Sequence, residues 1–71
     1  MSKVLFLRRG YAIPQEYVAD KLGISRKTLR KKENGDSNFT KIEMITYTNI
    51  LKQYDPQLTI EKIFFDQMFS N

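Results

Sequence analysis

The stretch QEYVADKLGISRKT, residues 15–28, decides the fold of this 71-residue chain. Its first apolar residues have the i, i+1, i+4 spacing of one face of an amphipathic helix: Val18, Ala19 and Leu22. Gly23 follows at once, and glycine readily takes the left-handed backbone conformation that ends many helices. Ser25 is a candidate N-cap for another helix only two residues later. The stretch therefore predicts two helices joined by a turn of three residues.

The turn at residues 23–25 and the helix that follows it indicate a function. Ala19 is small where the two helices approach each other, and Ile24 and Leu29 supply apolar contacts that hold the second helix onto the first. Two helices joined in this way form a helix-turn-helix, whose second helix lies in the major groove of DNA. We therefore expect a DNA-binding helix-turn-helix over about residues 15–34, with Gly35 terminating its second helix.

The sequence before this unit predicts one further helix. It begins at Val4–Leu7 and ends near Gly10–Ala12, and Pro14 stands where the first turn of the following helix would begin.

Two more helices are predicted after the unit. Thr40 and Glu43 form a capping box for a fourth helix, whose apolar residues are Met44, Ile45, Tyr47, Thr48 and Leu51. Thr59 is a candidate N-cap for a C-terminal helix over about residues 59–69, with these residues facing inward: Ile60, Ile63, Phe64 and Met68. The connections are short and no strand alternation persists, so we expect a compact all-α domain of five helices over residues 1–71.

The positive charge of the chain is concentrated in one segment. Residues 25–32 hold five of the 12 Lys and Arg residues and no acid, whereas the rest has seven basic and eight acidic residues, a net charge of −1. A basic patch on a nearly neutral body suits a phosphate backbone, although such runs are also found as solvated helix faces. Nothing in the chain resembles the aromatic platform on which RNA bases stack.

Composition argues against several other classes of protein. The chain has no cysteine and no histidine, so it lacks the residues of disulfide frameworks, of thiolate metal sites and of His-activated nucleophiles. We expect no enzymatic activity, cofactor, metal or small-molecule substrate. The apolar run Val4–Leu7 is too short for a signal peptide or a membrane span, so we expect a cytoplasmic protein without membrane association.

The chain resembles the Cro/CI-like repressor domains of phages. The resemblance includes residues 15–28, the following Glu33-Asn34-Gly35, Leu7-Arg8 in the first helix and TIEKIF at residues 59–64, and it covers residues 4–64. It implies the five-helix lambda-repressor-like fold and a transcription regulator of a switch between lysis and lysogeny. The implied setting is a temperate phage of Gram-positive bacteria, with the protein in the host cytoplasm and bound to the nucleoid.

Helical geometry and the resemblance together predict the DNA contacts. Lys27, Arg30 and Lys31 lie about 100°, 40° and 140° around the helix from Arg26, on one exposed arc. The resemblance assigns base contacts to Arg26, Lys27 and Lys31, and Arg30 shares their arc. It assigns phosphate contacts to Gln15, Thr28 and Asn34, and Ser25 joins them at the helix N-terminus. It also implies a partly buried ion pair between Arg8 and Glu33.

Four positions depart from the family pattern. Lys32 stands where the family has an apolar residue, about 240° around the helix on its inward side; we expect its stem to reach solvent, or the helix to pack more loosely. Ala12 and Pro14 replace a glycine and a threonine, which weakens the cap of the second helix. Phe39 replaces a proline and offers an aromatic ring on the surface near the DNA.

The C-terminal aromatic residues suggest a protein partner. Phe65 and Phe69 lie four residues apart, outside the inward stripe of the last helix, and an exposed aromatic pair marks a protein contact. We expect a homodimer or a heterodimer with a phage repressor, unless the tail folds back over the core. The alternative function is an antirepressor, or modulator of repression, that acts mainly by binding the cognate CI-type repressor.

Overall fold

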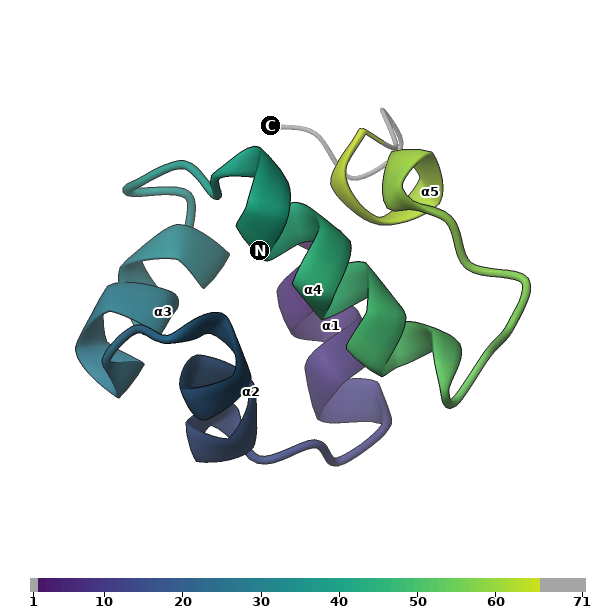
Figure 1. Cartoon of the computed structure of the whole chain (residues 1–71), viewed down its shortest axis with the longest axis horizontal. Coiled ribbons are helices and arrows are strands. Elements are labelled where there is room, and N and C mark those ends of the chain that lie inside the picture. The colour runs from purple at the N-terminus through teal and green to yellow at the C-terminus, as the bar shows by residue number, and fades with distance from the viewer. Residues whose placement is uncertain (1, 66–71) are drawn as a thin grey trace.

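The computed structural model describes residues 2–65, which contain five α-helices and no strand (Figure 1). The helices are α1 (Lys3–Gly10), α2 (Gln15–Leu22), α3 (Arg26–Glu33), α4 (Lys41–Lys52) and α5 (Ile60–Phe64). α4 packs against α2 and α5, α3 packs against α2, and α1 packs against α5. The predicted all-α fold of five helices is confirmed.

The helix ends follow their local capping residues. The side chains of Ser25 and Thr59 accept hydrogen bonds from backbone N–H groups in the first turns of α3 and α5, and Thr40 and Glu43 form a complete capping box. Gly23 ends α2 in the left-handed conformation, with φ 72°. These four predictions are confirmed, because each depends only on residues within a few positions along the chain.

Two predicted helix boundaries differ from the structure. Pro14 is the N-cap of α2 rather than part of its first turn, because its ψ of 137° is extended, and α2 therefore has no side-chain cap. α5 ends at Phe64, with Phe65 outside helical geometry as its C-cap. The predicted helix through residue 69 is thus wrong at Phe65, and its last part, including Met68, lies outside the described residues.

The core corrects two predictions about apolar side chains. The largest fully buried apolar side chains include Leu29, Val18, Leu51 and Val4. Phe39 was expected on the surface, but it is half-buried, and its ring meets the Tyr47 ring at 5.8 Å and the Phe64 ring at 5.2 Å, both edge to face. Phe39 lies in the loop between α3 and α4, but burying a large aromatic ring is favourable enough for its side chain to pack against the core instead of facing solvent.

Ile45 was expected among the apolar residues that carry the fourth helix, but its side chain is exposed. Helix period explains the difference, because Ile45 lies about 160° around the helix from the fully buried Tyr47. α4 therefore has apolar side chains on its outer face as well as its inner face.

Replacing Ala12 by glycine should stabilise the protein by about 1 kcal/mol. Ala12 has φ 57°, the left-handed conformation in which its Cβ crowds the following carbonyl group. Glycine has no Cβ, so it removes that strain. Urea unfolding of Ala12→Gly measures the gain. The reciprocal control is Gly23→Ala, also at positive φ, which should destabilise by a similar amount; an unchanged midpoint for both variants would show that these turns bear no strain.

Candidate nucleic-acid interface

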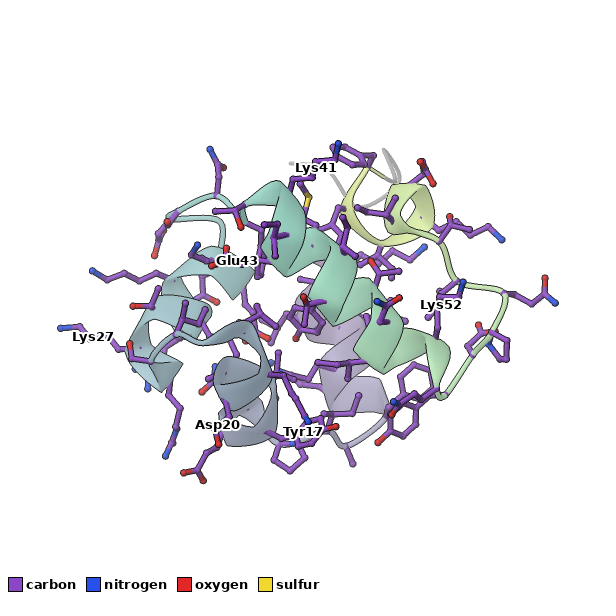
Figure 2. All side chains as sticks on the ribbon, in the orientation of Figure 1. Tyr17, Asp20, Lys27, Lys41, Glu43 and Lys52 are labelled. Atoms are coloured by element: carbon purple, nitrogen blue, oxygen red, sulfur yellow. The ribbon has the colours of Figure 1, made fainter. Side chains whose placement is uncertain are left out.

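Helix α3 has an anchored side and a charged side. Leu29 is fully buried in the core and Glu33 is 1 % exposed, which holds the inner side of α3 against the domain. The opposite side carries four exposed cations, here named the α3 outer face: Arg26, Lys27, Arg30 and Lys31. Figure 2 shows Lys27 extending away from the body of the molecule. The structure therefore presents as a group the four residues that were predicted to read bases.

The turn between α2 and α3 is a compact hydrogen-bonded unit. The Gly23 N–H donates to the Asp20 carbonyl at 3.2 Å, and the Ile24 N–H donates to the Ala19 carbonyl at 3.0 Å. Ala19 is buried, and Ile24 packs against the core. The left-handed Gly23 turns the chain sharply enough for α3 to pack across α2. This is the geometry in which a helix-turn-helix presents its second helix to DNA.

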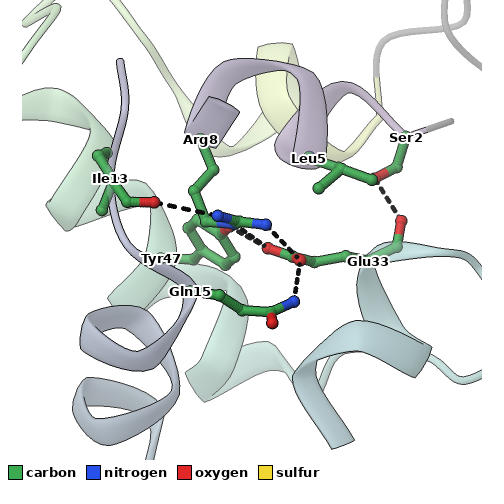
Figure 3. Close-up of polar contacts among 7 residues, drawn as sticks. All are labelled: Ser2, Leu5, Arg8, Ile13, Gln15, Glu33 and Tyr47. Atoms are coloured by element: carbon green, nitrogen blue, oxygen red, sulfur yellow. Dashed lines mark hydrogen bonds and ion pairs between the residues drawn. The ribbon is translucent and has the colours of Figure 1, made fainter. Parts of the chain in front are cut away.

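A buried carboxylate ties α3 to the rest of the domain (Figure 3). Glu33 accepts hydrogen bonds from Arg8 Nε at 2.7 Å and Arg8 Nη2 at 3.2 Å. It also accepts from Tyr47 Oη at 2.5 Å and from Gln15 Nε2 at 3.1 Å. Arg8 Nη1 donates further to the Ile13 carbonyl at 3.0 Å. The Glu33 network, defined as Arg8, Gln15, Glu33 and Tyr47, thus joins four helices.

The Glu33 network shifts the pKa values of Arg8 and Tyr47. Burial alone would lower the pKa of Arg8, but the hydrogen bonds and charge of Glu33 hold it above its ordinary value. Burial and the hydrogen bond to Glu33 raise the pKa of the Tyr47 hydroxyl. Arg8 therefore stays charged and Tyr47 stays neutral. Sequence reasoning missed the polar role of Tyr47, although a tyrosine in a core stripe signals that its hydroxyl needs a partner.

The residues predicted to contact phosphate lie near the ends of α2 and α3. Ser25 Oγ accepts from the Thr28 N–H at 3.0 Å and donates to Thr28 Oγ1 at 2.9 Å. Asn34 is the exposed C-cap of α3. Gln15 opens α2 and is half-buried, and its amide nitrogen has an intramolecular partner, Glu33, that the sequence did not indicate.

Lys32 is directed away from the other cations of α3. Its Nζ donates to Glu43 Oε1 at 2.5 Å, and the two side chains are only 10 % and 12 % exposed. The same oxygen accepts from the Thr40 N–H at 2.8 Å in the capping box of α4. The expected exit of Lys32 to solvent is thus wrong, because a carboxylate on the neighbouring helix neutralises it.

Lys32→Met should remove part of the acid sensitivity of the fold. Burial would raise the pKa of Glu43, but the hydrogen bonds from Lys32 and from the Thr40 backbone lower it below its ordinary 4.5. The stability from this shift is fully present above that value and is lost as pH falls through the folded-state pKa. The difference in unfolding free energy between native protein and variant should therefore shrink by ~0.5–1 kcal/mol in acid.

Urea unfolding from neutral pH to about pH 3 measures this change. Lys41→Met, at an exposed lysine of α4, the helix that carries Glu43, is the control and should follow the native protein at every pH. A constant difference between Lys32→Met and the native protein would contradict the coupling of Lys32 to Glu43.

The other predicted sites are only partly described. Phe65 is 61 % exposed, whereas Phe69 lies outside the described residues. Within residues 2–65, no group of His, Cys, Asp or Glu side chains is arranged to hold a metal ion. No helix in that range has the length and apolar character needed to cross a membrane.

Comparison with known proteins gives one match. A family model described as helix-turn-helix matches residues 7–58, which is more than half of the chain and includes all of α2, α3 and α4. No curated protein and no solved structure matches the chain.

Proposed function

The chain belongs to the helix-turn-helix family of DNA-binding transcription regulators, and from this premise we propose that it regulates the genetic switch of a phage. In the proposal, residues 1–71 act as one domain, and α3 enters the major groove of double-stranded operator DNA. The protein acts in the switch between lysis and lysogeny, alone as a homodimer or together with a partner repressor.

One observation carries the proposal. The α3 outer face holds four exposed cations and no carboxylate, and its backbone is anchored by buried Leu29 and Glu33. Arginine and lysine suit the O6 and N7 acceptors of guanine, so we assign base reading to the α3 outer face. An anchored backbone keeps these side chains in register with the bases, which sequence-specific recognition requires.

Phosphate contacts are assigned to the helix ends beside that face: Gln15, Ser25, Thr28 and Asn34. For Gln15 the proposed donor is the backbone N–H, because its amide nitrogen donates to Glu33 and α2 has no side-chain cap that would compete. Backbone N–H groups at a helix N-terminus favour anions. These contacts position the protein, whereas the α3 outer face specifies the sequence.

Selection from a random duplex library tests the proposal without knowledge of the operator. The isolated protein should enrich one sequence class, and log affinity should fall linearly with log salt, by about 0.9 for each phosphate neutralised. Enrichment of no sequence, with binding that ignores salt, would contradict direct recognition of DNA. Footprinting the selected site then gives the length of DNA that the protein covers.

Exposure of Phe65 favours a second candidate, a modulator that acts mainly by binding the cognate CI-type repressor. An aromatic ring with 61 % of its surface exposed is a candidate protein contact, and Phe69 is a second phenylalanine four positions further along the sequence. DNA footprinting with and without the cognate CI-type repressor distinguishes a regulator that binds DNA directly from a modulator that acts through the repressor. Protection only in its presence, abolished by polar replacement of Phe65 and Phe69 in a folded variant, would favour the modulator.

A further inference from the structure

The outer face of α4 combines apolar side chains with positive charge. Ile42 is 76 % exposed, the highest value among the exposed large hydrophobic residues of the described chain, and Ile45 is exposed on the same side of the helix. Exposed Lys41 and Lys52 stand at the two ends of α4, and the four side chains lie within an arc of about 100° around the helix. Glu43, the acid of this helix, is held by Lys32 instead. We name Lys41, Ile42, Ile45 and Lys52 the α4 outer face.

The outer face of α2 has the opposite charge. Glu16 and Asp20 are exposed, and Tyr17 beside them has 41 % of its surface exposed. These three positions also span about 100° of their helix, and Lys21 lies at one edge, with its Nζ 5.4 Å from the centre of the Tyr17 ring. We name Glu16, Tyr17 and Asp20 the α2 outer face.

The charges of these two faces are not neutralised within one molecule. Over residues 2–65, neither the two acids of the α2 outer face nor the two lysines of the α4 outer face enter an ion pair. Figure 2 shows why: Tyr17 and Asp20 lie at the edge below α2, whereas Lys41 and Lys52 lie at the two ends of α4. Neither face reaches the other in the same copy.

We propose that the α4 outer face of one copy binds the α2 outer face of a second copy. Lysine charges on one face meet the carboxylates on the other, and isoleucine side chains meet a tyrosine, across helix faces of similar angular width. Charge complementarity of this kind selects orientation and partner. The contact joins two different surfaces, so the arrangement is head-to-tail. In a pair, the α2 outer face of one copy and the α4 outer face of the other stay free.

The small number of apolar groups sets the strength of this contact. Three exposed apolar side chains cover much less than the area of a stable interface. The copies therefore associate weakly, and mainly where the local concentration of the protein is high. The α3 outer face takes no part, so copies bound at neighbouring DNA sites remain able to touch. That consequence rests on the proposed function, whereas the association itself does not.

Backbone amide chemical shifts, followed from micromolar to millimolar protein without DNA, test the association directly. The shifts of residues 16–21 and 41–52 should change with concentration, and high salt should reduce the change because it screens exposed charges. Spectra that do not change with concentration would overturn the proposal. So would changes confined to α5, which would indicate a different interface. Because DNA is absent, this result is independent of the DNA-binding test.

Two single variants distinguish a head-to-tail contact from a symmetric one. Ile42→Asp damages only the α4 outer face and Tyr17→Asp only the α2 outer face, so each protein alone should lose concentration dependence. Their mixture should form a one-to-one pair, because each supplies one intact face. Glu61→Gln, which removes an exposed carboxylate of α5 that lies outside both faces, should associate like the native protein. A mixture that stays monomeric, or loss of association in Glu61→Gln, would overturn the proposal.

The fold of each variant is checked by its circular-dichroism melt. If either aspartate variant unfolds, the charge variants Lys41→Glu and Glu16→Lys replace it, since both positions are exposed. Each of these should lower association on its own. Native-like association in both would overturn the proposal.

Discussion

Glu33→Gln is expected to lower the free energy of unfolding by ~3–5 kcal/mol, the cost of breaking a buried ion pair. The Glu33 carboxylate is buried and accepts four hydrogen bonds, two from Arg8 and one each from Gln15 and Tyr47. Glutamine replaces one acceptor oxygen with a donor that faces other donors. It also leaves the Arg8 guanidinium charged in the interior without its counter-ion. For a domain of this size, the loss approaches the whole stability of the fold.

Thermal and urea unfolding of Glu33→Gln measure this loss. Tyr47→Phe is the matched control, because it removes one hydrogen bond to the same carboxylate without removing a charge and should cost less, ~1.5–3 kcal/mol. Glu61→Gln, at an exposed carboxylate of α5, should leave the melt unchanged. A Glu33→Gln protein that melts together with the native one would show that the Glu33 network does not anchor α3.

Arg26→Ala is expected to weaken binding to the selected DNA site by ~1–3 kcal/mol, the worth of a good contact between an arginine and a base. Arg26 is the first residue of α3 and is exposed, and the N-terminal residues of a recognition helix are those that reach base edges. The preference at one base pair should relax, because the discriminating contact is lost while the phosphate contacts remain.

Fluorescence anisotropy on the selected site and on its single-base variants measures both effects. Arg9→Ala is the control, since Arg9 is an exposed arginine of α1, outside the α3 outer face. Equal weakening on every sequence would assign Arg26 to phosphate instead of a base. Unchanged binding on all sequences would remove Arg26 from the interface and contradict recognition through the N-terminal end of α3.

The sequence by itself determined the helices and their order. Gly23, Ser25 and the Thr40–Glu43 capping box act on backbone groups within a few residues of themselves, so their effects follow from local geometry. The helical period likewise places Leu29 inward and the four cations of the α3 outer face outward. These features are enough to predict a helix-turn-helix with a basic second helix.

Only the tertiary structure decided which side chains meet. Glu33 and Arg8 are 25 positions apart in the sequence, and the resemblance to phage repressors suggested that pair, but the structure added Gln15 and Tyr47. Lys32 meets Glu43 of α4 across 11 positions instead of reaching solvent. Partners so far apart in the chain are chosen by how the helices pack, because a buried charge or ring takes whichever counterpart the fold brings within reach. Helical period states on which side of α3 Lys32 lies, but not that a carboxylate stands there.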